Sequence, residues 1–429
     1  MKESEAKPLL AVLVDSDIDA DNRVKKHIDH ALHVGMEVRA IGFSNSISHI
    51  TKIHDGAIVL NRIRAALFGE SHQISRTQRS RRSISEPFVI SNSFSLVKIP
   101  GGIKRVLYAL LIIRLNFVVF TWLRRTKPDI VLANDPHFLP AAALYEKLSK
   151  SNPRVIYDSH EDFFAYRLGS IEGKFLSFLE RSFLRSHWQF VAVSESIADR
   201  LSQRYRPDRQ VVVLRNYPSK RLMRESVRKL RLDAGFSEED KVVVYSGLAS
   251  ESRGLELLIR AVAETDELKL ALVVNTHSTT HKYLQELITS YKCTDRSAIL
   301  PYVAPEEVVD YVSGADVAVL PFLRHRKDGS INSQLDGALA NKLFDSWNAE
   351  LKLVISDCKE QVRFTEGDPN TFVYDSSSLK GLINALRFAA TKKHDGTIRR
   401  HVFWEDQSEA FEFMYSQEPR RRFPNSLDL

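Results

Sequence analysis

A short stretch toward the carboxyl-terminal end of the chain places a lysine and a carboxylate at the start of an expected helix. Residues 338–357 read ALANKLFDSWNAELKLVISD, so Asn341, Lys342 and Asp345 fall within five positions. The start of a helix favours a phosphate, because its backbone N–H groups and its dipole attract negative charge. A carboxylate nearby can accept hydrogen bonds from sugar hydroxyls. The stretch therefore indicates a site for a phosphate and a sugar, or else an ordinary helix whose polar side chains are only solvated.

Other polar residues follow expected strands. They are His137 in NDPHFLP (134–140), His160 and Glu161 in YDSHEDF (157–163), Gly247 and Arg253 in GLASESRGLELL (247–258), and Asn332 in PFLRHRKDGSINS (321–333). Ligands of open α/β sheets bind outside the carboxyl ends of the strands, which makes these residues candidates for a site. His160 and Glu161 could equally make local hydrogen bonds at a polar strand end. No GxGxxG follows the first strand, which weighs against NAD or FAD as a ligand.

The elements that must position these residues alternate between strand and helix. Strands are expected at residues 9–14, 37–41, 96–99, 129–133, 154–157, 190–193 and 211–214, and the pattern restarts at residues 241–247. Val- and Ile-rich strands separated by helices predict parallel sheets covered on both faces. We therefore expect two doubly wound, Rossmann-like domains that face a central cleft, joined by a linker within residues 216–237.

The bulk composition is that of an ordinary globular protein. The 429 residues suit two domains, and 43% of them are hydrophobic and 27% charged. The two cysteines, Cys293 and Cys358, give neither a disulfide framework nor a metal-ligand spacing. The first apolar run is too short for a signal peptide and is followed at once by acidic residues. These features predict a cytoplasmic protein.

The net charge of +7 is concentrated in one segment. Residues 61–105 contain nine Lys or Arg residues and only two acidic residues, Glu70 and Glu86, so the rest of the chain is balanced. The excess indicates an anionic partner such as a phospholipid surface or a pyrophosphate-bearing substrate. Nucleic acid is disfavoured, because the basic run has no interleaved aromatic residues and no reader motif. Residues 45–100 are expected to be irregular.

An apolar stretch, VLYALLIIRLNFVVFTWLRR, occupies residues 106–125. We interpret it as a buried helix of the first domain with Arg114 and Asn116 at solvent-facing positions. The alternative is an interfacial helix whose flanking cations contact anionic lipid. Those cations are Lys98, Lys104, Arg105, Arg124 and Arg125.

Together these stretches resemble the nucleotide-sugar-dependent, retaining glycosyltransferases of the GT-B fold, glycosyltransferase family 4 (group 1). The resemblance is carried by DNRVKKHIDHALHVGMEVRAIG, KPDIVLANDPHFLPAAAL, VIYDSHEDF, VAVSESIADRL, VVVLRNYP, VVVYSGLASESRGLELLIRAV, ADVAVLPF and NKLFDSWNAELKLVISD. They span most of residues 8–357 in the order that the family shows. FWEDQSEAFEFMY, near the end, resembles the last helix of that fold, which crosses back to the first domain.

The resemblance implies roles for individual residues. Lys342 and Arg253 would hold the donor diphosphate, Asp345 would bind the nucleotide ribose, and His160 would face the transferred sugar and the acceptor. A leaving diphosphate gains negative charge, which two cations and a helix start would stabilise, so no metal ion is expected. Further substrate-binding candidates are Asn341, Glu161, Gly247, Asn332 and His137.

The chain departs from the family pattern at three positions. Gly337 stands where the family often has a glutamate, and the neighbouring Asp336 is out of register. Leu248 stands where many relatives carry arginine after the glycine. Asp345 is one methylene shorter than the usual glutamate.

We therefore expect a metal-independent glycosyltransferase without a cofactor, acting in the synthesis of a cell-surface polysaccharide or glycolipid. It would move a hexose from a UDP- or GDP-sugar to a saccharide or lipid-linked acceptor, from the cytoplasm or peripherally at the inner face of the membrane. The expected domains are an acceptor-side domain (1–218, with a basic irregular segment at 45–105), a donor-binding domain (219–395) and a returning helix with a frayed tail (396–429). The alternatives are a non-catalytic GT-B-like subunit that binds a partner or a membrane, and a sugar-nucleotide epimerase.

Overall fold

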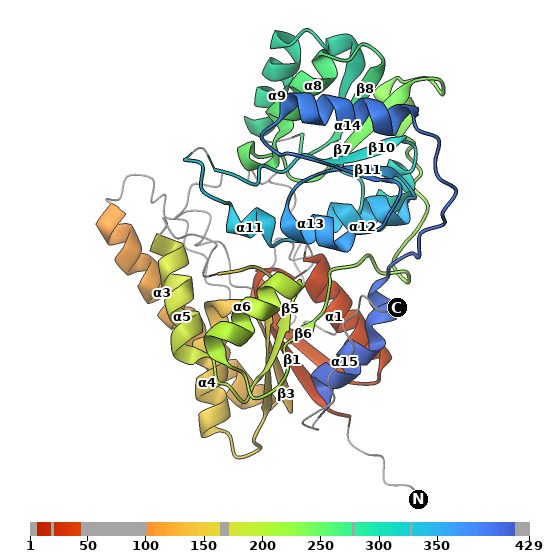
Figure 1. The fold of residues 1–429 in the computed structure, drawn as a ribbon. Coiled ribbons are helices and arrows are strands. Elements are labelled where there is room, and N and C mark those ends of the chain that lie inside the picture. Colours follow the sequence, from red (N-terminus) through yellow and green to blue (C-terminus); the bar gives the residue numbers. More distant parts are fainter. Residues whose placement is uncertain are drawn as a thin grey trace, which may run out of the picture. The chain divides into compact units, whose positions relative to one another are not determined.

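The computed structural model describes residues 7–18, 21–43, 101–163, 171–276, 279–326 and 328–416. The chain divides into two compact units (Figure 1). One unit takes in residues 1–192, 198–212 and 412–429, and the other takes in residues 193–197 and 213–411. Each unit is built on one six-stranded sheet.

The sheet of the first unit has the strand order β2-β1-β3-β4-β5-β6. Its strands are β1 (Leu9–Asp17), β2 (Glu37–Phe43), β3 (Ile130–Asn134), β4 (Arg154–Ser159), β5 (Gln189–Ala192) and β6 (Val212–Val213). The pairs from β2 to β5 are parallel, with Leu13 opposite Ala133 and Asn134 opposite Asp158. Strand β3 is buried along its whole length, as expected for a strand covered on both faces. The register brings the carboxyl ends of β1, β3 and β4 to one edge.

Helices follow the strands of this sheet. They are α1 (Asn22–His33), α3 (Gly101–Thr126), the 3₁₀ turn η2 (Pro136–Phe138), α4 (Leu139–Leu148), α5 (Ile171–Phe183) and α6 (Glu195–Tyr205). Asp21 caps α1, because its side chain accepts hydrogen bonds from the backbone N–H groups of Arg23 and Val24. The end of α15 (Ser408–Tyr415) is tied to β4 by Arg154, which donates to the carbonyls of Met414 and Ser416.

The sheet of the second unit is parallel throughout, in the order β12-β11-β10-β7-β8-β9. Its strands are β7 (Lys241–Ser246), β8 (Leu268–Val273), β9 (Ser297–Leu300), β10 (Val317–Leu320), β11 (Lys352–Ser356) and β12 (Thr371–Tyr374). The sequence of β7, KVVVYS, is apolar without alternation because both faces of this central strand are buried.

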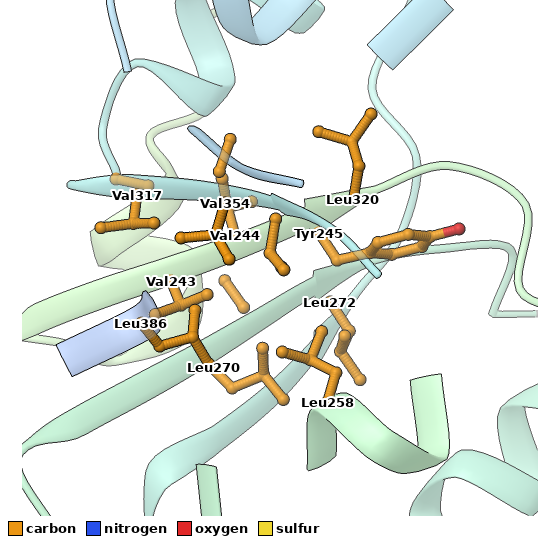
Figure 2. Packing of buried hydrophobic residues seen from close by; sticks show 14 of the residues in the cluster. Val243, Val244, Tyr245, Leu258, Leu270, Leu272, Val317, Leu320, Val354 and Leu386 are labelled. Carbon is orange, nitrogen blue, oxygen red and sulfur yellow. The ribbon is translucent and has the colours of Figure 1, made fainter. Parts of the chain in front are cut away.

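Helices cover both faces of the second sheet. They are α7 (Leu230–Ala234), η3 (Glu251–Arg253), α8 (Leu255–Ala263), α9 (Thr279–Ser290), η4 (Thr294–Arg296), α10 (Val308–Val312), α11 (Ser333–Asp336), α12 (Asn341–Asn348), α13 (Lys359–Phe364), α14 (Leu379–Thr391) and η5 (Trp404–Gln407). Figure 1 shows α8, α9 and α14 on one side of this sheet and α12 and α13 on the other. In the core, Leu258 of α8 and Leu386 of α14 pack with strand residues such as Val243 and Leu270 (Figure 2).

The fold class predicted from the sequence is confirmed, since each unit is built on a parallel sheet with helices between its strands. The expected strand at 96–99 and the irregular segment at 45–100 lie outside the described residues, as does most of the basic excess. The predicted domain boundaries stay a prediction. None of the helices in the described ranges has the length and apolar character needed to cross a bilayer.

One expectation for helix α3 is wrong. Arg114 is exposed as predicted, but Asn116 is buried. Its amide donates to the carbonyl of His137 at 2.9 Å and accepts from the backbone N–H of Ala141 at 3.0 Å. Asn116 thus satisfies backbone groups where η2 meets α4, which keeps this polar side chain inside.

Candidate functional site

In the second unit, Lys342 extends from the first turn of α12 to the carboxyl end of β7. Its Nζ atom donates a hydrogen bond to the Tyr245 hydroxyl at 3.0 Å and lies 4.5 Å from the centre of that ring. Figure 2 shows the Tyr245 hydroxyl pointing away from the aliphatic core. Gly247 follows β7 with φ +128°, and a Cβ atom there would lie 2.5 Å from Lys342 Nζ. The backbone conformation therefore favours glycine, and the end of the Lys342 side chain occupies the space beside it.

Arg253 approaches the same place from η3. Its guanidinium carbon lies 4.4 Å from the centre of the Phe322 ring, and Lys342 Nζ lies 5.2 Å from the same centre. Phe322 is fully buried and follows β10. The Nε atom of Arg253 is buried without a hydrogen-bond partner among the described residues. Two cations thus share one aromatic ring, and one of them has an unused donor.

This proximity perturbs the lysine. Burial lowers the pKa of Lys342 well below its usual value, and the positive charge of Arg253 lowers it further, while Asp345 partly opposes both effects. The helix start adds to the positive potential, because the N-cap residue Ala340 makes no side-chain capping hydrogen bond. An anion bound here would offset the positive charge of Arg253 and raise the pKa of the lysine again.

The other candidate residues of this unit differ in how they are placed relative to Lys342. Asp345 lies one turn after Lys342 on the same half-buried helix face, close enough to act on its pKa. Asn341 is exposed, and its side-chain oxygen accepts a hydrogen bond from Asn216 at 3.0 Å. Asn332 stands at the start of α11, and its backbone N–H donates to the carbonyl of Arg324. Asn332 is thus held by the loop after β10 rather than by Lys342.

The positions that depart from the family pattern have defined surroundings. Gly337 ends α11, and its carbonyl accepts a hydrogen bond from Ser194. The neighbouring Asp336 is paired with Arg324 at 2.9 Å and accepts from the backbone N–H of Lys359. Its carboxylate is therefore anchored within the unit. Leu248 is exposed, and its carbonyl accepts from the Tyr245 hydroxyl at 2.6 Å.

In the first unit, a buried carboxylate at the end of β4 organises a second polar cluster. Asp158 is fully buried and accepts two hydrogen bonds from Arg23, at 2.8 Å from Nε and 2.7 Å from Nη2. His27, one helical turn after Arg23, lies 3.0 Å from the same carboxylate through Nε2. Helix α1 thus turns a charged face inward to meet the strand end.

His160 lies beside this carboxylate, two residues further along the chain. Its Nε2 atom is 3.3 Å from Asp158 Oδ2, and its Nδ1 atom is 3.6 Å from Asp135 Oδ2. The side chain of Asp135 also accepts a hydrogen bond from the backbone N–H of His160 at 3.2 Å. Asp135 has φ 61° and ψ 171°, a region that is essentially reserved for glycine and costs about 1–3 kcal/mol. Such strain is typical of a functional strand end.

The two histidines on Asp158 have opposite protonation. Burial lowers the pKa of His160, but the charges of Asp135 and Asp158 outweigh this and raise it to about 9. Burial also lowers the pKa of His27, and here it prevails over the attraction of Asp158, so the value falls to about 4. Burial raises the pKa of Asp158, but Arg23 and the nearby histidines hold it well below its usual value. At neutral pH the cluster presents a charged His160 and a neutral His27.

The remaining candidates of the first unit flank this cluster. His137 is buried in η2, with its Nε2 atom 2.9 Å from Asp15 Oδ2 of β1, and its charge acts on Asp135. The Glu161 carbonyl accepts a hydrogen bond from the Ser159 hydroxyl at 2.8 Å. The structure therefore brings His137 and His160 to one strand-end cluster and gives Glu161 a backbone contact there.

Sequence reasoning did not single out several members of these sites. They are Arg23, His27, Asp135, Asp158, Tyr245 and Phe322. Most stood inside stretches that were read as strand ends, and the spacing of Arg23 and His27 places them on one helix face. Within the described ranges, no group of three or more His, Cys, Asp or Glu side chains is placed to hold a metal ion.

Comparison with known proteins gives two family matches. Residues 81–217 match the family described as Glycosyltransferase Family 4, and residues 226–329 match Glycosyl transferases group 1. The two matches together cover more than half of the chain. No curated protein sequence matches it.

Solved structures share the fold over almost the whole chain. Sucrose-phosphate synthase from Thermosynechococcus elongatus superposes with a TM-score of 0.62 at 13% identity, covering 90% of each chain. HepE from Anabaena in complex with UDP-glucose gives 0.60 at 15%, covering 89% of this chain and 90% of that one. A glycosyltransferase from Rickettsia africae gives 0.58 at 12%, covering 96% and 100%. At these identities the likeness establishes the fold.

Two doubly wound units and both family matches define the class of the protein. The chain is a GT-B glycosyltransferase of the family 4, group 1 type, as the sequence resemblance implied.

Proposed function

We propose that this glycosyltransferase moves a hexose from a UDP- or GDP-sugar to an acceptor hydroxyl with retention of configuration. The observation that carries the proposal is the arrangement of Arg253 and Lys342 on one Phe322 ring, with Asp345 on the same helix as the lysine. A nucleoside diphosphate offers what this site lacks, namely two negative charges beside a hydroxyl-bearing ribose. UDP is the first nucleotide to test, because HepE was solved with UDP-glucose.

In this mechanism the cations act on the leaving group. As the bond between the sugar and the β-phosphate breaks, negative charge grows on the diphosphate, and Arg253 and Lys342 stabilise it. Each such preorganised donor lowers the barrier by on the order of 3 kcal/mol. Asp345 accepts hydrogen bonds from the ribose and fixes the orientation of the donor. No metal ion is required for these steps.

The cluster of the first unit serves the sugar and the acceptor. A protonated His160 donates a hydrogen bond to a sugar hydroxyl, while Asp158 and Asp135 keep its charge. The acceptor is a saccharide or a lipid-linked saccharide, which would place the reaction in cell-surface polysaccharide or glycolipid synthesis. That setting and a cytoplasmic location rest on the analogy with the fold.

The test starts with ligand binding by the full chain. A thermal-shift screen against UDP, GDP, ADP and their sugars should identify one nucleotide, since a ligand at 100 times its Kd adds about 2.7 kcal/mol of stability. The shift should disappear in Lys342→Ala and Arg253→Ala and persist in Lys380→Ala, which removes an exposed lysine from α14. If both site variants keep the full shift, the donor site lies elsewhere.

Turnover is tested with the donor that binds. The anomeric configuration of the product reports retention, and activity that survives a chelator reports metal independence. Gly337 and Leu248 favour the competing possibility of a non-catalytic subunit. Tight nucleotide binding without donor cleavage, across a panel of saccharide and lipid-linked acceptors, would support that alternative and contradict the proposed transfer.

A further inference from the structure

The outward face of helix α3 carries a stripe of large apolar side chains. Leu110, Ile113 and Phe117 are 56%, 65% and 66% exposed. Their spacing of three and four residues places them on one face of the helix. The opposite face is buried, and its members are Ile112, Leu115, Val119, Trp122 and Leu123. The stripe is therefore additional to the apolar surface that holds α3 in the unit.

The rotation of α3 about its axis is fixed, so the stripe cannot turn inward. Asn116 lies on the buried side and bonds to backbone groups of His137 and Ala141. Turning the stripe toward the core would break both hydrogen bonds and expose Trp122, which is 6% exposed. The stripe is therefore exposed in the stable folded state of the unit.

Helix α5 packs on the buried side of α3. Ile112 of α3 clusters with Leu176 and Leu179 of α5, and Figure 1 shows the two helices side by side. Because Ile112 lies on the face opposite the stripe, this contact holds α3 in the unit and leaves the stripe uncovered.

The charged side chains of α3 are all basic. Arg114, Arg124 and Arg125 are exposed, and the sequence of α3 contains no acidic residue. We call Leu110, Ile113 and Phe117, with these arginines, the α3 face. Apolar side chains flanked by cations match an anionic bilayer, which has a hydrocarbon core and negatively charged headgroups. Arginine suits it further, because its planar fork binds phosphate through two hydrogen bonds.

We propose that the α3 face docks on an anionic lipid bilayer. The apolar side chains enter the boundary between headgroups and acyl chains, and the arginines bind lipid phosphates. Helix α3 would lie in the plane of the interface. The proposal does not depend on glycosyl transfer, because docking requires neither donor nor acceptor.

The experiment is flotation of the full-length protein with vesicles of phosphatidylcholine alone or mixed with phosphatidylglycerol. The wild type should float with the anionic vesicles and much less with the neutral ones. The variant I113S/F117S should lose at least about tenfold in partitioning, because two inserting side chains become polar. The variant R124Q/R125Q should bind less at 0.1 M salt, where the Debye length is about 10 Å, and resemble the wild type at 1 M, where it is about 3 Å.

A matched control removes two exposed apolar side chains from the other unit. Val227 and Leu232 are 93% and 80% exposed, so V227S/L232S also replaces two exposed apolar side chains with serine while leaving the α3 face intact. It should float like the wild type. Circular dichroism and the melting temperature should be unchanged in every variant, because all of these residues are exposed.

Three results would overturn the proposal. The wild type could fail to bind anionic vesicles, or I113S/F117S could bind as well as the wild type. Light scattering could also show a dimer that I113S/F117S converts to a monomer, in which case a second copy covers the face. Each readout is obtained without nucleotide, so a failure here is separate from a failure of the proposed reaction.

Discussion

Arg23 and Asp158 are 135 residues apart in sequence and form a bidentate ion pair in the interior of the first unit. The guanidinium is 3% exposed and the carboxylate is fully buried. A pair of this kind contributes little to stability relative to apolar residues, but removal of one partner leaves the other charge buried. The pair therefore fixes α1 on the end of β4 and, through Asp158, the place of His160.

We expect Asp158→Asn to lower stability by about 3–5 kcal/mol, since it removes the carboxylate that pairs with the buried Arg23 through two hydrogen bonds. Arg23→Lys should cost about 1–3 kcal/mol, because an ammonium cannot make both parallel hydrogen bonds. Thermal unfolding of the full chain measures both. Arg39→Lys alters an exposed ion pair with Glu37 in the same unit and should change stability by less than about 1 kcal/mol. Equal effects at Arg23 and Arg39 would contradict the assigned role.

His27 should make the fold sensitive to mild acid. Its pKa is about 4 when folded, against an ordinary value of 6.5, so between these values the unfolded chain binds a proton that the folded chain excludes. Stability should therefore fall as pH decreases from about 6.5 to 4, by up to about 3 kcal/mol from this residue. His27→Gln should flatten that part of the pH profile of the melting temperature. Replacing the exposed His187 with glutamine should leave the slope unchanged.

His160 should set an alkaline limit on turnover. Its pKa of about 9 keeps the imidazole ring protonated at neutral pH. The charged ring can therefore donate its hydrogen bond below about pH 9 and loses this ability above it. The groups that face it are Asp135, Asp158, Arg23 and His27. We expect kcat/KM to be level below about pH 8 and to fall about tenfold per pH unit well above 9. In His160→Gln the rate should be low and this limb absent; an unchanged limb would assign it to another group.

Nucleotide binding should be coupled to proton uptake at Lys342. Burial and Arg253 depress the pKa of the free lysine, and a bound diphosphate should raise it again. Titration calorimetry with UDP in two buffers of different ionisation enthalpy should reveal uptake of up to about one proton. Lys342→Met should abolish the buffer dependence. Identical heats for the wild type in both buffers would show that the lysine is already charged before the ligand binds.

Asp345 should discriminate a nucleotide from a bare diphosphate. We expect Asp345→Asn to weaken UDP binding about tenfold, because the amide accepts ribose hydroxyls less strongly than the carboxylate. Binding of inorganic pyrophosphate should be unaffected, as it has no ribose, whereas Arg253→Ala should weaken both ligands. Asp266→Asn, at a fully exposed position, is the control. Equal losses for UDP and pyrophosphate in Asp345→Asn would place the carboxylate near the phosphates instead.

The fold could be predicted because parallel strands with two covered faces have a distinctive sequence. KVVVYS and its counterparts are continuously apolar, and the polar residues that follow them had to collect at strand ends. His160, Arg253 and Lys342 were singled out by that reasoning. Their positions after strands or at helix starts are local properties that the sequence displays directly.

The partners of these residues could not be predicted in the same way. Arg23 and His27 reach Asp158 across more than 130 residues, and their polar types are those usually found on a solvated helix face. Asn116 was expected at the surface for the same reason, yet backbone groups of His137 and Ala141 hold it inside. Buried polar contacts depend on which distant groups need a partner, and local periodicity does not encode that.

Gly254 brings two backbone segments of the second unit into direct contact beside the proposed donor site. It has φ +67°, and a Cβ atom there would lie 1.8 Å from the carbonyl oxygen of Pro321, so the main chains after β7 and β10 touch without an intervening side chain. A single added methyl group would have to displace the backbone of Pro321, the residue directly before Phe322, whose ring both Arg253 and Lys342 approach. The backbone at this point therefore tolerates little adjustment. A change of donor preference, in evolution or by engineering, would have to come from exchanging side chains around a frame that keeps its shape.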